Sequence, residues 1–163
     1  MVWGVVNVVL YQPENPHNTG GIARTCALLD ARLHLIQPFG FAYPNRDLRR
    51  SSMEYVNLAA PVIHASWEAF TGTLEEAASL WLFSDAGTTV YSAARFSAGD
   101  YLVFGRESDG LPAAILAAHT SLSIPMPGAA RGARGDHRFH SLNVSVSVGI
   151  ALSEALRQIS LLG

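Results

Sequence analysis

The sequence predicts an α/β fold: a parallel sheet flanked by helices, in a single domain that covers residues 1–163. Short apolar runs rich in β-branched residues recur along the chain, as buried parallel strands do. Segments with helical periodicity alternate with these runs, which is typical of parallel sheets. Gly, Pro and Asn stand at many of the junctions. The length suits one hydrophobic core, and no internal repeat is evident.

The first strand and the first helix are predicted from the N-terminal third of the chain. Val5–Leu10 is an apolar, β-branched run. A loop rich in Pro and Asn follows it, and Asn18 or Thr19 is predicted to cap a helix over Gly20–Asp30. Arg32–Gln37 is the second predicted strand.

Within that helix, the 3.6-residue spacing places Ile22, Cys26 and Leu29 on one apolar stripe and points Arg24 away from it. The segment Asn18–Arg24 also brings two glycines and free backbone N–H groups to a helix start, where an anion is stabilised. Taken alone, this segment fits a capped helix with one solvated arginine equally well.

The middle of the chain predicts shorter elements. Four helical pieces are expected at Asp47–Arg50, Ser66–Phe70, Thr73–Ser79 and Pro112–His119, the third with a Thr73–Glu76 capping box. Four strands are expected at Pro61–Ala65, Leu80–Ser84, Tyr101–Phe104 and Ser121–Ile124. Near the C-terminus, Val144–Val148 alternates with the period of a strand, whereas Ala151–Arg157 is helical, so the pattern alone leaves that boundary open.

Composition limits the class of protein. The chain is 49% hydrophobic but only 15% charged, which suits a buried parallel sheet or an apolar face covered in a dimer. The single Cys26 forbids an internal disulfide and suits a reducing compartment. The N-terminus has no basic region before its apolar run, and no apolar run reaches the ~18 residues of a membrane span. We therefore expect a cytoplasmic protein without a membrane partner.

Charge places any nucleic-acid contact in local patches. The net charge is −2, and all 11 basic residues are arginines, which suit bidentate phosphate contacts but also follow from genomic composition. Arg46, Arg49 and Arg50 cluster in the sequence near Tyr43. This cluster fits either a solvated helix face or a phosphate-binding patch. The loop 127–140 carries three more arginines and is expected to be disordered in the free protein.

Three separated segments carry the functional signal. Phe104–Pro112 reads Phe-Gly-Arg-Glu-Ser-Asp-Gly-Leu-Pro directly after a predicted strand, Asn18–Arg24 lies far upstream, and Ser141–Gly149 lies near the end. Each alone fits an ordinary turn or helix cap. In this order they resemble the SPOUT family of RNA methyltransferases, in its ribose 2'-O-methylating branch, over nearly the whole chain. Leu48-Arg49-Arg50 followed by Tyr55 is similar to the subgroup that methylates the wobble ribose of tRNA.

The resemblance implies a C-terminal deep trefoil knot, the SPOUT or α/β-knot fold, and a C-terminal segment that is helical throughout. It implies S-adenosylmethionine-dependent 2'-O-methylation of the wobble nucleotide (position 34) of tRNA, with S-adenosylhomocysteine as product, and a homodimer with sites completed across two subunits. The alternatives are methylation of another tRNA or rRNA nucleotide and a non-catalytic module that binds an adenosyl ligand or RNA.

Site residues follow from the same resemblance. The catalytic candidates are Arg24, Glu107, Ser141 and Asn143. The cofactor-binding candidates are Phe83, Gly105, Glu107, Ile124, Met126, Ser141 and Leu142. The RNA-binding candidates are Asn18, Arg46, Arg49 and Arg50. Because a guanidinium stays protonated in proteins, an orienting or phosphate-holding role suits Arg24 as well as the base role that the family implies.

Some positions depart from the family pattern or carry no signal. Relatives often have Pro at Arg106 and Arg at Asp109, so a phosphate contact is missing at Asp109, and they usually have Asn at Gly21. The six histidines and Cys26 lack metal-ligand spacing, so we expect no metal site. No P-loop and no dinucleotide-binding glycine motif is present.

Overall fold

The computed structural model describes residues 6–43, 54–128 and 141–159. Its centre is a seven-stranded sheet in the order β3-β2-β1-β6-β4-β7-β5, with every neighbouring pair parallel. The strands are β1 Asn7–Tyr11, β2 Arg32–Ile36, β3 Val62–His64, β4 Leu80–Phe83, β5 Thr89–Val90, β6 Tyr101–Phe104 and β7 Thr120–Ser123. The predicted parallel α/β sheet is therefore confirmed.

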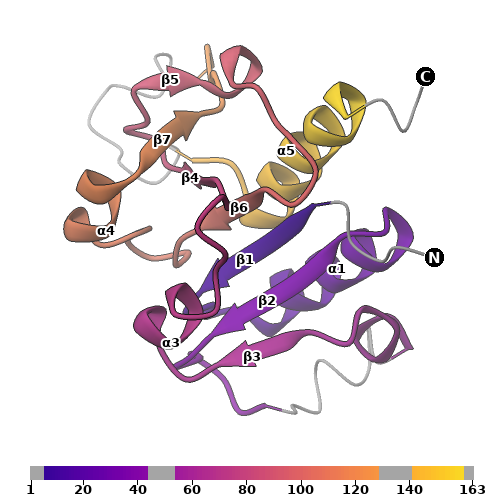
Figure 1. Ribbon diagram of the computed structural model, residues 1–163. Coiled ribbons are helices and arrows are strands. Elements are labelled where there is room, and N and C mark those ends of the chain that lie inside the picture. Colours follow the sequence, from indigo (N-terminus) through magenta and orange to yellow (C-terminus); the bar gives the residue numbers. More distant parts are fainter. Residues whose placement is uncertain (1–5, 44–53, 129–140, 160–163) are drawn as a thin grey trace.

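Helices cover both faces of this sheet (Figure 1). They are α1 Pro16–Leu28, α3 Trp67–Thr71, α4 Ala113–Ala118 and α5 Val144–Gln158, together with a helical turn over residues 54–59 and the 3₁₀ turn Tyr91–Ala93. Residues of α1 and α5 share one core cluster with β1, β2 and β6, whereas Phe70 of α3 and the partly buried residues of α4 belong to the cluster on the opposite face. None of the helices in the described ranges is long and apolar enough to span a membrane.

The first helix begins earlier than predicted. Its N-cap is Asn15, whose Oδ1 accepts hydrogen bonds from the backbone N–H groups of His17 and Asn18, and Pro16 occupies the first helical position. The predicted caps Asn18 and Thr19 therefore lie inside the helix. The Asn15-Pro16 pair was predicted to lie in a loop because Asn and Pro are common in turns. The same pair is also a strong helix start, and it begins α1 here.

Two further expectations need correction, and one open boundary is settled. Leu29 is 39% exposed beyond the end of α1, so it does not continue the buried stripe that includes Ile22 and Cys26. Residues 73–79 form turns rather than a helix, and the hydroxyl of Thr73 donates to the Phe70 carbonyl at 2.7 Å instead of capping. Conversely, Val144 to Gln158 is one continuous helix, so its alternating valines are helical, as the family resemblance implied.

A buried polar chain crosses the sheet beneath these helices. The amide of Asn7 donates to the carbonyl of Gly99, which leaves its Oδ1 to accept from His34 Nε2 at 3.1 Å. His34 Nδ1 then accepts from His64 Nε2 at 3.0 Å. Both histidines are at least 93% buried and neutral in this arrangement. Burial, with the nearby charges of His64 and Arg32, lowers the pKa of His34 from 6.5 to about 4, and burial also lowers the pKa of His64.

These histidines predict a loss of stability in mild acid. Between pH 6.5 and about 4 the unfolded chain binds protons that the folded chain does not, so the free energy of unfolding falls as the pH falls. The slope is up to about 1.4 kcal/mol per pH unit for each histidine. Urea titrations at pH 7, 6 and 5 measure it. His34→Gln should flatten the slope, and an equal slope in both proteins would contradict the assignment.

Candidate active site

A cavity of about 630 Å³ opens beyond the carboxyl ends of β4, β6 and β7. The rings of Phe83 and Phe104, at the ends of β4 and β6, stack in its wall with centroids 4.8 Å apart. Ligands of parallel α/β proteins bind at this edge of the sheet, and the volume lies in the usual range for small-molecule sites. The sheet and the chain entering α5 thus frame one site.

All seven residues predicted to hold the cofactor line this cavity: Phe83, Gly105, Glu107, Ile124, Met126, Ser141 and Leu142. Asn18 and Asn143 line it as well. The structure therefore brings together segments that are up to 125 positions apart in the chain. Their cofactor and catalytic roles remain predictions.

The turn after β6 is closed tightly on itself. Arg106 and Gly110 form an antiparallel bridge, with the Arg106 N–H donating to the Gly110 carbonyl and the Gly110 N–H to the Arg106 carbonyl. A Cβ at Gly105 would lie 2.3 Å from the carbonyl carbon of Gly110 and 2.4 Å from the nitrogen of Leu111. Glycine is therefore needed at position 105 so that the turn can fold back against the strand end.

A salt bridge spans the same turn. Arg106 Nε and Nη2 donate to the two carboxylate oxygens of Asp109 at 2.6 and 2.8 Å, and Nη1 donates to the side-chain oxygen of Gln12 at 3.0 Å. The hydrogen bond from Arg106 lowers the pKa of Asp109, and Asp109 in turn raises the pKa of Arg106. The two departures from the family pattern are thus one paired feature, in which Asp109 compensates the charge of Arg106.

Glu107 joins the turn to the first helix and, through Asn18, to the last. Its carboxylate accepts from the backbone N–H groups of Glu14 and Asn15 at 2.9 and 3.3 Å and from the amide of Asn18 at 3.3 Å. Asn18 Oδ1 then accepts from Asn143 Nδ2 at 3.0 Å, and Asn143 caps α5 through the Ser145 N–H. We name the series Glu107–Asn18–Asn143 the amide relay. The start of α1, where an anion is stabilised, is thus occupied by the carboxylate of Glu107.

A second carboxylate, that of Glu14, binds the turn after β6 and was not predicted from the sequence. Glu14 accepts from the Ser108 N–H at 2.8 Å and from the Ser108 hydroxyl at 2.9 Å. No local pattern connects two residues 94 positions apart. The cavity-lining Ser84 and Ala86 were missed too, although the rule that singled out Gly105, proximity to the end of a buried strand, applies to them equally.

Arg24 does not line the cavity. It lies on the exposed face of α1, as predicted, with its guanidinium carbon 4.8 Å from the centre of the Tyr55 ring. The remaining RNA-binding candidates Arg46, Arg49 and Arg50 and the predicted helix Asp47–Arg50 lie outside the described residues, as does most of the loop 127–140. Within the described ranges, no group of three His, Cys, Asp or Glu side chains is placed to hold a metal ion.

Known proteins are similar to this chain over nearly its whole length. The model of the SpoU rRNA Methylase family matches residues 5–153. The tRNA (cytidine(34)-2'-O)-methyltransferase of Escherichia coli K12 is 39% identical over 158 residues, which are 95% of this chain and 94% of the relative.

Two solved structures extend the comparison. One, described as giving structural insights into the 2-OH methylation of C/U34 on tRNA, is 42% identical and superposes with a TM-score of 0.87, covering 100% of this chain and 94% of that one. The other, an rRNA methyltransferase from Sinorhizobium meliloti with bound AdoMet, is 26% identical with a TM-score of 0.71, covering 96% of this chain and 57% of that one.

Proposed function

This chain belongs to the SpoU rRNA Methylase family, and from that premise we propose that it methylates the ribose 2'-oxygen of nucleotide 34 in tRNA. The observation that carries the proposal is the cavity at the end of β4, β6 and β7, which gathers every residue expected to hold the methyl donor. Relatives that match 95% and 96% of the chain are named for this reaction.

The cavity suits S-adenosylmethionine as the donor. Ile124, Met126 and Leu142 provide apolar side chains for an adenine ring, and Gly105 allows the turn beside them to stay closed at the cavity wall. The related Sinorhizobium enzyme was crystallised with this cofactor. When bound, the cofactor supplies a methyl group already activated on a positively charged sulfur.

The chain's own groups would orient the acceptor and stabilise charge on its 2'-oxygen, whose proton passes to solvent. The amide relay fixes Glu107 beside Asn143 through Asn18, so these two groups keep a constant spacing at the cavity rim. Ser141 lies two residues before the α5 cap and lines the same rim. Arg24 would hold the ribose or its phosphate and stabilise charge on the 2'-oxygen as the proton leaves.

Because Arg24 does not line the cavity of its own chain, we propose a homodimer in which a second copy supplies it. Exposed apolar side chains on the helical segments that pack against one core cluster support this arrangement: Leu28 and Leu29 at the end of α1, Leu58 in the 54–59 turn and Val146 on α5. An obligate interface of this kind buries roughly 2,000 Å² or more. Sedimentation at micromolar concentration should give a dimer, and an active monomer would refute it.

The finer points of the fold belong to the same proposal. A single domain covers residues 1–163, it acts in the cytoplasm, and the C-terminal segment forms a trefoil knot. The knot is supported by the position of α5, whose Gln158 side chain accepts from the Phe96 N–H at 2.9 Å and donates to the Ala94 carbonyl at 3.0 Å. The end of α5 is thereby held against the segment between β5 and β6 (Figure 1).

Mapping the methylated nucleotide tests the function. Unmodified total tRNA is incubated with the protein and labelled S-adenosylmethionine, and the modified nucleotide is identified by mass spectrometry of nuclease digests. We expect 2'-O-methylation at position 34 only. Methylation elsewhere in tRNA or only in rRNA would overturn the substrate assignment, and cofactor binding without transfer to either RNA would overturn the enzymatic one.

The arginine segment should set tRNA affinity. Arg49→Ala and Arg50→Ala are expected to raise the tRNA KM and to flatten its salt dependence, with maximal rate retained, because phosphate contacts release counterions. Steady-state kinetics at two salt concentrations measure both effects. Loss of turnover at saturating tRNA with unchanged affinity would show that these arginines do not dock the RNA.

A further inference from the structure

The backbone of Arg24 is held firmly, but its side chain is not buried. Ile22, Ala23 and Cys26 on the opposite face of α1 are at most 1% exposed, so the helix is fixed against the sheet. Arg24 itself is exposed. A long side chain on a rigid helix keeps many rotamers open, and a defined guanidinium position therefore needs a second contact.

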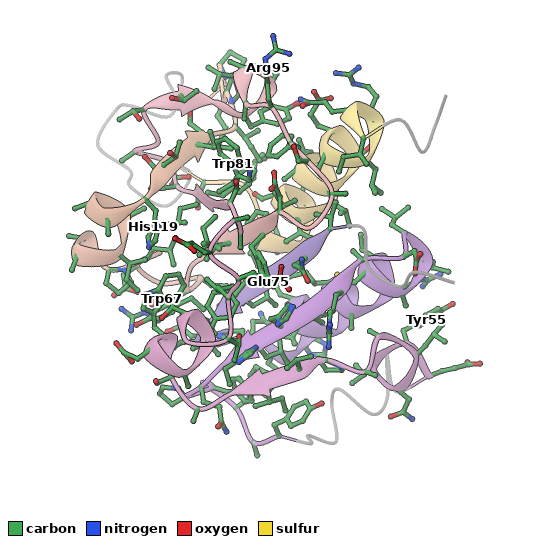
Figure 2. All side chains as sticks on the ribbon, in the orientation of Figure 1. Tyr55, Trp67, Glu75, Trp81, Arg95 and His119 are labelled. Carbon is green, nitrogen blue, oxygen red and sulfur yellow. The ribbon has the colours of Figure 1, made fainter. Side chains whose placement is uncertain are left out.

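Tyr55 provides that contact. Its ring lies under the guanidinium of Arg24, with 4.8 Å between the guanidinium carbon and the ring centre, which is within cation–π range. Figure 2 shows Tyr55 on the short helical turn beside α1. That turn is anchored by Val56 and Ala59, which pack against the core cluster shared by α1 and α5. Both partners of the contact thus stand on fixed backbone.

An aromatic ring and a carboxylate hold an arginine side chain in different ways. Two other arginines in the described ranges, Arg106 and Arg157, are paired through two N–H groups each with Asp109 and Glu154, at 2.6 to 2.8 Å. Such pairing compensates the charge and occupies the donors. No carboxylate partner is recorded for Arg24 among the described residues, so the Tyr55 ring orients its guanidinium while its N–H groups remain available to a ligand.

We propose that Tyr55 is a positioning residue: its ring holds the Arg24 guanidinium in one orientation, with charge and donors free for the ribose–phosphate of the tRNA. The proposal rests on the proposed function and adds a residue to it. In this proposal Tyr55 acts through Arg24 and does not contact the RNA. Its loss should therefore lower kcat, whereas the loss of a residue that docks the RNA should raise the tRNA KM.

Three variants separate these roles. Tyr55→Phe keeps the ring and Tyr55→Leu removes it. Tyr91→Leu removes a partly buried ring of the 3₁₀ turn after β5, which packs on the same core cluster. We expect kcat to fall about tenfold in Tyr55→Leu and to stay within about twofold in Tyr55→Phe and Tyr91→Leu. The tRNA KM and the cofactor Kd should stay unchanged in all three.

An NMR measurement tests the contact independently of activity. The Nε–H proton of Arg24, assigned with Arg24→Lys, should be shifted upfield by the ring current in the wild type and in Tyr55→Phe, and should return to the random-coil position in Tyr55→Leu.

Two results would overturn the proposal. One is a raised tRNA KM with unchanged kcat in Tyr55→Leu, because the ring would then contact the RNA. The other is a wild-type kcat and Arg24 shift in Tyr55→Leu. If the wild type does not methylate nucleotide 34, the proposed function fails instead, and the Arg24 shift still decides whether Tyr55 holds the guanidinium.

Discussion

Arg24→Ala is expected to lower turnover on tRNA by about 10² to 10³-fold, the loss that follows removal of a charge-stabilising donor. Cofactor affinity should be unaffected, because the cavity is formed by the segments after β4, β6 and β7 and before α5, whereas the Arg24 that the second copy supplies would contact the acceptor ribose or its phosphate. Single-turnover kinetics and calorimetry with S-adenosylhomocysteine measure the two quantities separately.

Arg95→Ala is the matched control. Arg95 is an exposed arginine at the far end of the molecule from Tyr55 (Figure 2). Its removal changes the net charge equally but should leave turnover within about twofold, as surface substitutions usually do. Near wild-type turnover in Arg24→Ala would remove the catalytic assignment. A large loss of cofactor affinity in that variant would instead place Arg24 at the donor site.

Gly105→Ala is expected to abolish cofactor binding. The added Cβ would meet the backbone at Gly110 and Leu111 at 2.3 to 2.7 Å, where no flexible side chain can move aside. The turn must therefore open, and with it the contacts through which Arg106, Glu107 and Ser108 reach the loop after β1. A larger side chain would act in the same way, by displacing the turn rather than by filling space that the ligand needs.

Calorimetry shows the loss, and circular dichroism checks that the sheet remains. Gly128→Ala is the control, because a Cβ there meets no atom of the described residues within 4 Å. It should bind the cofactor like the wild type. Unchanged affinity in Gly105→Ala would mean that the turn adapts and that the cofactor does not depend on its closed form.

Much of the fold could be predicted because the central strands are largely apolar runs that a parallel sheet buries on both faces. The bounds of β6 were predicted to the residue, and those of β2 and β4 to within one. The two-residue strand β5 was not predicted, because Thr89 and Val90 pair only at the edge with β7 and need no pattern of their own. Thr73 and Glu76 fit a capping box, but the hydroxyl of Thr73 bonds backward to Phe70 and no helix follows.

Individual residues of the site could be predicted from the sequence, but the contacts between them could not. Gly105 and Glu107 could be found because they directly follow a buried strand, and Ser141 and Asn143 because they precede a helix. The contact of Glu14 with Ser108 and the link from Asn18 to Asn143 join residues 94 and 125 positions apart, and no periodicity records such distances. The Tyr55 contact of Arg24 was missed for the same reason.

The amide relay also has a consequence for the synthesis of the protein. A ribosome delivers the sheet strands and the Glu107 turn before Ser141 to Ser147. Until those residues emerge, Asn18 has no Asn143 to pair with and the cavity lacks one wall. A nascent chain that stops short of them therefore has a sheet but an incomplete cavity.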